Sequence, residues 1–267
     1  MTAGGVHAEF IGDAGHRLFA LLRTPARASG ECVLVVPPFA EEMNKSRRLV
    51  TDFARHERSK GRGVLCVDLF GTGDSEGEFA AARVEGWIED LAAAIEWSAA
   101  QGWRVTSMLG IRMGAILGAM LARQRDLGLS QTVFWQPMVS GARLLDQFLR
   151  VRVMASRMER DRNETVAELR TRLQAGETVE VAGYALSGAL CADIDALDLV
   201  AALTPAFPPI RWLDVVADAT APMAPGTQRA VDKARAIGCD VEHVQVTGEP
   251  FWMATEIVTN PALVAAS

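Results

Sequence analysis

The segment that decides the fold reads Gly110-Ile111-Arg112-Met113-Gly114. It follows a short apolar run, residues 105–109, and opens a segment, residues 113–125, in which apolar residues recur at spacings of three and four. The first pattern is typical of a buried strand and the second of a helix. Glycines on both sides of Arg112 suit a strained strand-to-helix turn, because side chains there would collide with neighbouring backbone. The sequence therefore predicts a strand, a tight turn with Arg112 at its tip, and a closely packed helix.

The same alternation of apolar run and amphipathic segment extends along most of the chain. Strands are predicted at residues 18–22, 32–36, 64–67, 105–109, 132–135, 210–216 and 241–246. Helices are predicted at residues 43–56, 84–100, 113–125 and 228–237. Strands that alternate with helices favour the α/β class, with a mostly parallel sheet flanked by helices.

The alternation stops at about residue 141 and resumes after residue 203, where three prolines mark the return. Helical stripes run through residues 144–154 and 164–173, and residues 179–184 suit a short strand or turn. We predict a core made of residues 1–140 and 204–267, with residues 141–203 inserted as a helical lid over the carboxyl ends of the strands.

Composition narrows the functional classes. The 267 residues carry 27 Lys and Arg against 33 Asp and Glu, and no basic patch is interleaved with aromatic residues, so nucleic acid is not an expected partner. No N-terminal signal peptide and no membrane span are expected, since no basic start precedes an apolar run and no apolar stretch is long enough. The four cysteines are widely separated and form no metal-binding or redox motif, which suits a reducing cytoplasm. No cofactor or metal is predicted.

The turns after the predicted strands carry the chemistry, because reactive groups gather at the carboxyl ends of strands in such sheets. The turn after residues 64–67 reads Asp68-Leu69-Phe70-Gly71-Thr72-Gly73-Asp74-Ser75. It closely resembles the D-x-R-G-x-G-x-S turn of α/β-hydrolases, with Phe70 at the arginine position. The segment around Arg112 resembles the G-x-S-x-G nucleophile elbow of the same superfamily, with arginine in place of serine.

The remaining positions of a hydrolase triad also differ. After residues 210–216 the acid position is filled by Asp218, and after residues 241–246 Glu249 stands where the histidine is expected. The turn after residues 32–36 carries Pro37 and Pro38 where an oxyanion loop is expected, and proline has no N–H to donate. Backbone amides of Phe39 or Ala40 can still point into a pocket, although a rigid corner is an equally good interpretation.

Over nearly its whole length the chain resembles the α/β-hydrolase superfamily, and more narrowly the second exosortase A system-associated hydrolase family. The segments that carry the narrower resemblance are residues 37–48, 110–115, 181–184 and 248–252. The resemblance implies a link to exopolysaccharide and protein-sorting systems, with a protein of such a system as a possible partner. It also implies that triad-equivalent Arg112, Asp218 and Glu249 form the site. The expected ligand-binding residues are Phe39, Ala40, Glu41, Ile111, Met113 and Trp252.

The site suggests three functions that differ in their chemistry. Arginine is neither nucleophile nor base, so ordinary serine esterase chemistry is disfavoured. A water activated by Glu249 or Asp218, with Arg112 stabilising a developing anion, is the enzymatic alternative. The favoured hypothesis is a non-catalytic fold that binds a small-molecule, acyl or glycan ligand or a protein partner. Its structural corollary is a buried ion-pair cluster of Arg112 with Glu249 and Asp218.

Overall fold

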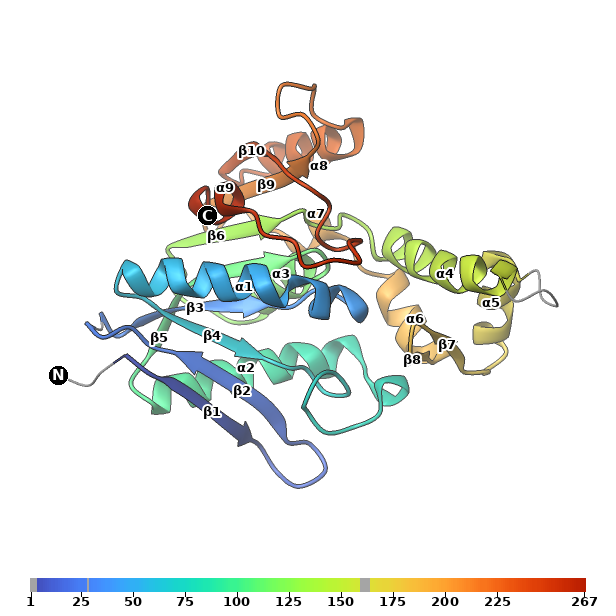
Figure 1. The fold of residues 1–267 in the computed structure, drawn as a ribbon, viewed down its shortest axis with the longest axis horizontal. Coiled ribbons are helices and arrows are strands. Elements are labelled where there is room, and N and C mark those ends of the chain that lie inside the picture. The colour runs from blue at the N-terminus through green and yellow to red at the C-terminus, as the bar shows by residue number, and fades with distance from the viewer. Residues whose placement is uncertain (1–3, 28, 159–163) are drawn as a thin grey trace.

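A single main sheet forms the centre of the structure. Its strands are β1 (Val6–Ile11), β2 (Leu18–Arg23), β3 (Glu31–Val36), β4 (Gly63–Val67), β5 (Arg104–Ile111), β6 (Gln131–Trp135), β9 (Ile210–Val216) and β10 (Val241–Thr247). The computed structural model describes residues 4–27, 29–158 and 164–267, and the strand order in the sheet is β1-β2-β4-β3-β5-β6-β9-β10 (Figure 1). Pairs from β4 to β10 are parallel, whereas β1–β2 and β2–β4 are antiparallel. The predicted α/β class with a mostly parallel sheet is confirmed.

Strand β1 is the element of this sheet that the sequence did not predict. Five of its six residues are exposed and only Ile11 is buried. An edge strand of this kind buries too little apolar surface to produce the run that marks a central strand.

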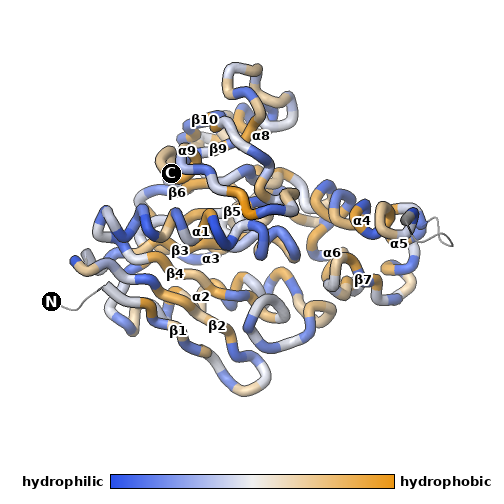
Figure 2. Tube along the Cα trace, in the orientation of Figure 1, coloured by the Kyte–Doolittle hydropathy of each residue, from blue (hydrophilic) through white to orange (hydrophobic). Residues whose placement is uncertain are grey.

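The two faces of the sheet are covered by different helices. Alternate residues of a strand point to opposite faces, and Val33 and Val35 pack with α1 (Glu41–Ser59) and α9 (Pro261–Ala265). Leu34 and Val36 belong to the other layer. That layer contains α2 (Val84–Ala100), α3 (Gly114–Gln124) and α8 (Pro225–Ala236). Figure 2 shows hydrophobic residues concentrated on the central strands, whereas much of α1 is hydrophilic.

The turn after β4 has the compact form that its glycines predict. Gly71 and Gly73 have φ values of 74° and 56°. Asp68 accepts a hydrogen bond from the backbone N–H of Asp74 at 3.0 Å, and a Cβ on Gly73 would lie 2.0 Å from its Oδ2 atom. The hydroxyl of Ser75 donates to the Asp68 carbonyl at 2.5 Å. Ser75 is therefore part of the turn.

Residues 141–203, which we call the cap segment, lie between β6 and β9 in the chain. Their described elements are α4 (Gly141–Met158), α5 (Val166–Gln174), β7 (Val179–Val181), β8 (Tyr184–Leu186), α6 (Gly188–Asp195) and α7 (Leu199–Ala202). Figure 1 shows α4, α5 and α6 beyond the carboxyl ends of the central strands. The ring of Phe148 on α4 lies 5.1 Å from that of Phe39 after β3, which joins the cap segment to the sheet. The division into core and lid remains a prediction.

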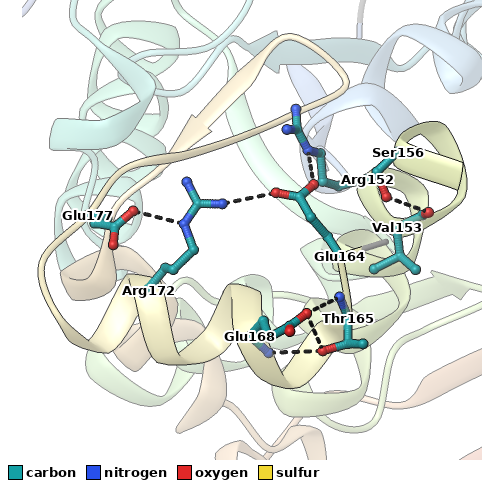
Figure 3. Close-up of polar contacts among 8 residues, drawn as sticks. All are labelled: Arg152, Val153, Ser156, Glu164, Thr165, Glu168, Arg172 and Glu177. Atoms are coloured by element: carbon teal, nitrogen blue, oxygen red, sulfur yellow. Dashed lines mark hydrogen bonds and ion pairs between the residues drawn. The ribbon is translucent and has the colours of Figure 1, made fainter. Parts of the chain in front are cut away.

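Polar contacts fix α4 against α5. Glu164 accepts a hydrogen bond from Arg152 on α4 at 2.7 Å and one from Arg172 on α5 at 3.0 Å (Figure 3). Thr165 and Glu168 form a reciprocal capping box at the start of α5. These contacts link α4 to α5 through Glu164. No helix in the described part of the chain is both long and apolar enough to cross a membrane.

The cysteines provide a test of the packing. Burial raises the pKa of both Cys32 and Cys191 to about 12. Because the thiolate is the reactive form, we expect both thiols to resist N-ethylmaleimide at pH ~8 in the native protein and to react once it is unfolded in urea. Mass spectrometry of the labelled peptides measures this. Rapid labelling of either thiol in the native protein would contradict the packing of β3 or α6.

Candidate functional site

The elbow after β5 has the backbone that the sequence predicted for it. Arg112 has a φ of 55°, a conformation that residues other than glycine rarely adopt. Its N–H donates to the carbonyl of Trp135 at 3.0 Å, and its own carbonyl accepts from Ala115 and Met138. A Cβ on Gly110 would lie 2.6 Å from the Cα of Ala115. The glycine frame is therefore needed, and it presents Arg112 at the carboxyl edge of the sheet.

The guanidinium of Arg112 is buried, and each of its three nitrogens donates a hydrogen bond. Its Nη2 atom donates to Oε1 of Glu42 at 3.0 Å, and its Nε atom lies 3.2 Å from the same oxygen. Its Nη1 atom donates to the carbonyl of Gln136 at 3.3 Å, and its Cζ atom lies 4.7 Å from the ring centroid of Trp252. The side chains of Arg112 and Glu42 are only 5% and 13% exposed. A two-pronged carboxylate contact and an aromatic face are typical anchors of a buried arginine.

Burial and the charge of Arg112 act in opposite directions on the pKa of Glu42. Burial raises the pKa of the Glu42 carboxyl above its ordinary value, and Arg112 opposes that shift. Without the guanidinium, desolvation would favour the protonated form still more. Glu42 therefore depends on Arg112 as its counter-charge.

Three corners around this pair have strained backbones. Ala40 after β3, Arg112 after β5 and Gln136 after β6 have φ values of 50°, 55° and 43°. Gln136 is fixed by a hydrogen bond from the N–H of Val215 to its side-chain oxygen at 2.7 Å. Such strain is retained where surrounding structure over-determines a position, often at functional sites.

The predicted cluster of Arg112 with Glu249 and Asp218 is corrected by the structure. Asp218 is exposed and accepts hydrogen bonds from the N–H and hydroxyl of Thr220 at 2.9 and 2.6 Å. Glu249 is exposed in the loop after β10, and among the described residues Arg112 is ion-paired with Glu42 alone. The reason is geometric: α1 follows β3, the neighbour of β5 in the sheet, so a carboxylate of its first turn lies beside the guanidinium.

Sequence reasoning missed Glu42 because that residue was considered only as part of the oxyanion-loop corner. The signal that could have found it is the acidic pair Glu41-Glu42 in the first turn of a helix that directly follows a central strand. Strands β3 and β5 are neighbours in the sheet, so their following turns meet at one edge.

The elbow opens into a large cavity between the cap segment and the core. The cavity has a volume of about 1510 Å³, and its floor includes Phe39, Glu42, Arg112 and Gln136. One wall is a face of α4 and another is a face of α8, while Trp252 closes a third side. Of the predicted ligand-binding residues, Phe39, Glu41 and Trp252 line this cavity. Ala40, Ile111 and Met113 are instead buried in the protein interior and do not line it.

His243, the histidine of strand β10, does not line the cavity. His243 pairs with Asp214 at 3.1 Å inside the sheet, and Asp214 also accepts from the indole of Trp212 at 3.0 Å. Among the described residues that line the cavity there is no histidine or cysteine, and Ser140 is the one serine. Its hydroxyl accepts a hydrogen bond from the N–H of Arg143 at 3.4 Å.

The structure has an α/β-hydrolase fold. The features that define it are the order of the strands in the sheet, the strand-turn-helix elbow and the segment that covers the elbow. The chain belongs to the serine aminopeptidase S33 family, which it matches over residues 28–202. A search of curated proteins gave no match.

Solved structures give the same fold at low sequence identity. Est1E from Butyrivibrio proteoclasticus, with ferulic acid bound, has 13% identity and a TM-score of 0.62, covering 94% of this chain and 93% of that one. DcsB in complex with its substrate analogue has 14% identity and a TM-score of 0.62, covering 98% and 96%. A putative hydrolase from Agrobacterium vitis S4 has 21% identity and a TM-score of 0.55, covering 92% and 90%. At these identities the likeness establishes the fold alone.

Proposed function

We propose that this chain is a degenerate α/β-hydrolase that binds a ligand in the cavity above its elbow and performs no serine-type catalysis. The observation that carries the proposal is the state of Arg112, which occupies the nucleophile position with its guanidinium held by Glu42, Gln136 and Trp252. A guanidinium has no lone pair with which to attack a carbonyl or accept a proton. The strained elbow is thus kept while its reactive group is replaced by a structural ion pair.

The enzymatic alternative, water activated by Glu249 or Asp218, has less support. Both carboxylates are exposed, and neither is among the described residues that line the cavity. A general base must come within hydrogen-bond reach of the water it activates. Arg112 also has its charge already neutralised by Glu42, which weakens it as a stabiliser of a developing anion.

The physiological setting is likewise proposed. The resemblance to exosortase-associated hydrolases supports a ligand or protein partner that belongs to exopolysaccharide or protein-sorting systems. The four cysteines are free thiols, which suits the cytoplasm. Deleting the gene in its source organism should reduce exopolysaccharide or sorted surface protein, and a copy carrying Arg112→Met with Glu42→Gln tests whether the elbow pair is needed. Normal levels of both products in the deletion strain would remove the link.

We expect the purified protein to leave p-nitrophenyl acetate and butyrate unhydrolysed and to resist a fluorophosphonate probe. Arg112→Ser should not restore turnover, because the histidine base is still missing and triad members act as a unit. Initial rates and probe labelling measured by mass spectrometry test this.

Ser140→Ala is the matched control, since Ser140 is the serine among the described cavity residues. Any weak labelling that disappears in this variant belongs to Ser140. Burst kinetics in the native protein that the fluorophosphonate abolishes would overturn the proposal.

A further inference from the structure

The cavity is bounded by one face from each of two helices. On α4 its lining residues are Arg143, Leu144, Gln147, Phe148, Arg150, Val151 and Met154. Residues at these spacings share one side of a helix. On α8 the same holds for Gly226, Arg229, Ala230 and Lys233, and Ile237 directly after the helix continues this face. The two helices thus present a continuous cleft to any occupant.

Cations on both walls of this cleft have no acidic partner. Arg143 and Arg150 lie on α4, and Arg229 and Lys233 lie on α8. Each is exposed, and within the described ranges none has a carboxylate within 4.0 Å, whereas Lys45 at the same cavity is paired with Glu41 at 3.4 Å. A Cβ on Gly226 would lie 3.9 Å from Nη1 of Arg143, so the guanidinium of Arg143 extends from α4 to α8.

This local charge is opposite in sign to that of the whole chain, which is −6 at neutral pH. The carboxylates among the described lining residues are Glu41, Glu42 and Asp198. The first two are paired with Lys45 and Arg112, and the third caps the first turn of α7. Positive charge therefore remains in excess, and it favours a multivalent anion with oxygens to share between two walls.

Apolar side chains lie beside these cations. Val151 and Met154 on α4, Ile237 directly after α8 and Met253 near Trp252 are 37%, 68%, 38% and 67% exposed, and all four line the cavity. Exposed apolar side chains gathered at one concave site are typical of binding surfaces. The volume of about 1510 Å³ exceeds the ~300–1,000 Å³ of common small-molecule sites.

We propose that the cavity binds a single amphiphilic molecule that has a phosphate headgroup and a long apolar chain. The arginines and lysine of α4 and α8 hold the phosphate oxygens, since arginine matches phosphate geometry with paired hydrogen bonds. Phe148, Met154 and Met253 cover the chain. This assignment rests on the proposed function and names the class of ligand for its cavity.

Calorimetric titration with decyl phosphate below its micelle concentration tests the assignment. Decyl phosphate should bind about tenfold or more tightly than inorganic phosphate, which lacks the chain, and decyltrimethylammonium should not bind. The affinity should fall as potassium chloride is raised, because the cations are exposed. Equal binding of the phosphate and ammonium amphiphiles would overturn the proposal.

Two variants test the cationic part and the apolar part of the site separately. Arg143→Gln with Arg229→Gln removes one cation from each wall and should lower the affinity for decyl phosphate about tenfold or more, without changing that for 1-decanol. Val151→Asp with Met253→Asp should lower the affinity for both decyl phosphate and 1-decanol. Arg104→Gln is the matched control, because Arg104 is exposed at the far end of β5 and outside the cavity. An unchanged decyl phosphate affinity in the first variant would place the ligand elsewhere.

Three further outcomes distinguish a failure of this assignment from a failure of the proposed function. Binding to anionic phospholipid vesicles that monomeric decyl phosphate does not inhibit would mean a membrane-facing surface and would overturn the cavity assignment. A thermal-shift screen that finds a neutral ligand, with no effect of decyl phosphate, would refute the ligand class and leave the proposed function intact. Burst kinetics that a fluorophosphonate abolishes would instead refute the proposed function, whatever binds in the cavity.

Discussion

Arg112→Met is expected to lower the free energy of unfolding by about 3–5 kcal/mol, because it leaves the Glu42 carboxylate buried without its counter-charge. For a protein of this size the lower figure corresponds to a fall in Tm of about 6–12 °C. Glu42→Gln should lower the free energy of unfolding by a similar amount. The double variant Arg112→Met with Glu42→Gln should recover part of this lost stability. Denaturant unfolding followed by circular dichroism measures all three.

Two controls make this test specific. Arg104→Met breaks the exposed pair with Glu31 at the other end of β5 and should cost no more than ~1 kcal/mol. Glu249→Gln should change nothing, since Glu249 is exposed and Arg112 is paired with Glu42. If Arg112→Met melts like the parent protein, the ion pair contributes nothing to the fold.

The deficit of Arg112→Met should also depend on pH. Burial raises the pKa of Glu42, and loss of Arg112 removes the charge that opposed this shift. A carboxyl whose folded-state pKa lies above its unfolded value contributes stability at low pH that is lost as pH rises through the folded pKa. The difference in unfolding free energy between parent and variant should therefore be larger at pH ~8 than at pH ~5. A constant difference would mean that Glu42 keeps its charge without Arg112.

Gly114→Ala is expected to cost roughly 3 kcal/mol, at the upper end of overpacking penalties. A Cβ at this first residue of α3 would lie 2.2 Å from the carbonyl oxygen of Val36 and 2.7 Å from that of Pro37. Both are backbone atoms at the end of the central strand β3, so neither can move without disturbing the sheet. Thermal and denaturant unfolding provide the measurement.

Two other helical glycines are matched controls for this result. A Cβ on Gly118 would meet the sulfur of Met108 at 2.5 Å, and this flexible side chain can move, so Gly118→Ala should cost much less. A Cβ on Gly86 of α2 would have no neighbouring atom within 4 Å, so Gly86→Ala should stabilise by about 0.5–1 kcal/mol. Equal losses at Gly114 and Gly118 would show that the close approach of α3 to β3 is not the cause.

The central strands and the elbow were predictable from sequence because burial on both faces produces continuous apolar runs. Helix α2 has the predicted bounds, Val84–Ala100, and β9 has the predicted bounds, Ile210–Val216. The partner of Arg112 was not predictable in the same way. Glu42 lies 70 positions away in the chain, and only the neighbouring placement of β3 and β5 brings it to the elbow.

The hairpin of β7 and β8 is a second feature that the sequence predicted only in part. Residues 179–184 suggested a strand or a turn, and the structure has two strands joined by Ala182 and Gly183. Both have positive φ, 50° and 84°, as a two-residue turn of this kind requires. Alanine rarely adopts a positive φ, so the sequence of residues 182–183 does not clearly predict the turn.

Under the proposed function, the contact between Arg112 and Glu42 makes a serine elbow difficult to obtain by single changes. A lone Arg112→Ser substitution supplies the hydroxyl but leaves a carboxylate buried with no cation, so the first step of such a path is destabilising. A change at Glu42 made first instead leaves the Arg112 guanidinium buried without a carboxylate partner. A stable elbow with serine at position 112 thus requires coordinated changes at both positions before any histidine is added.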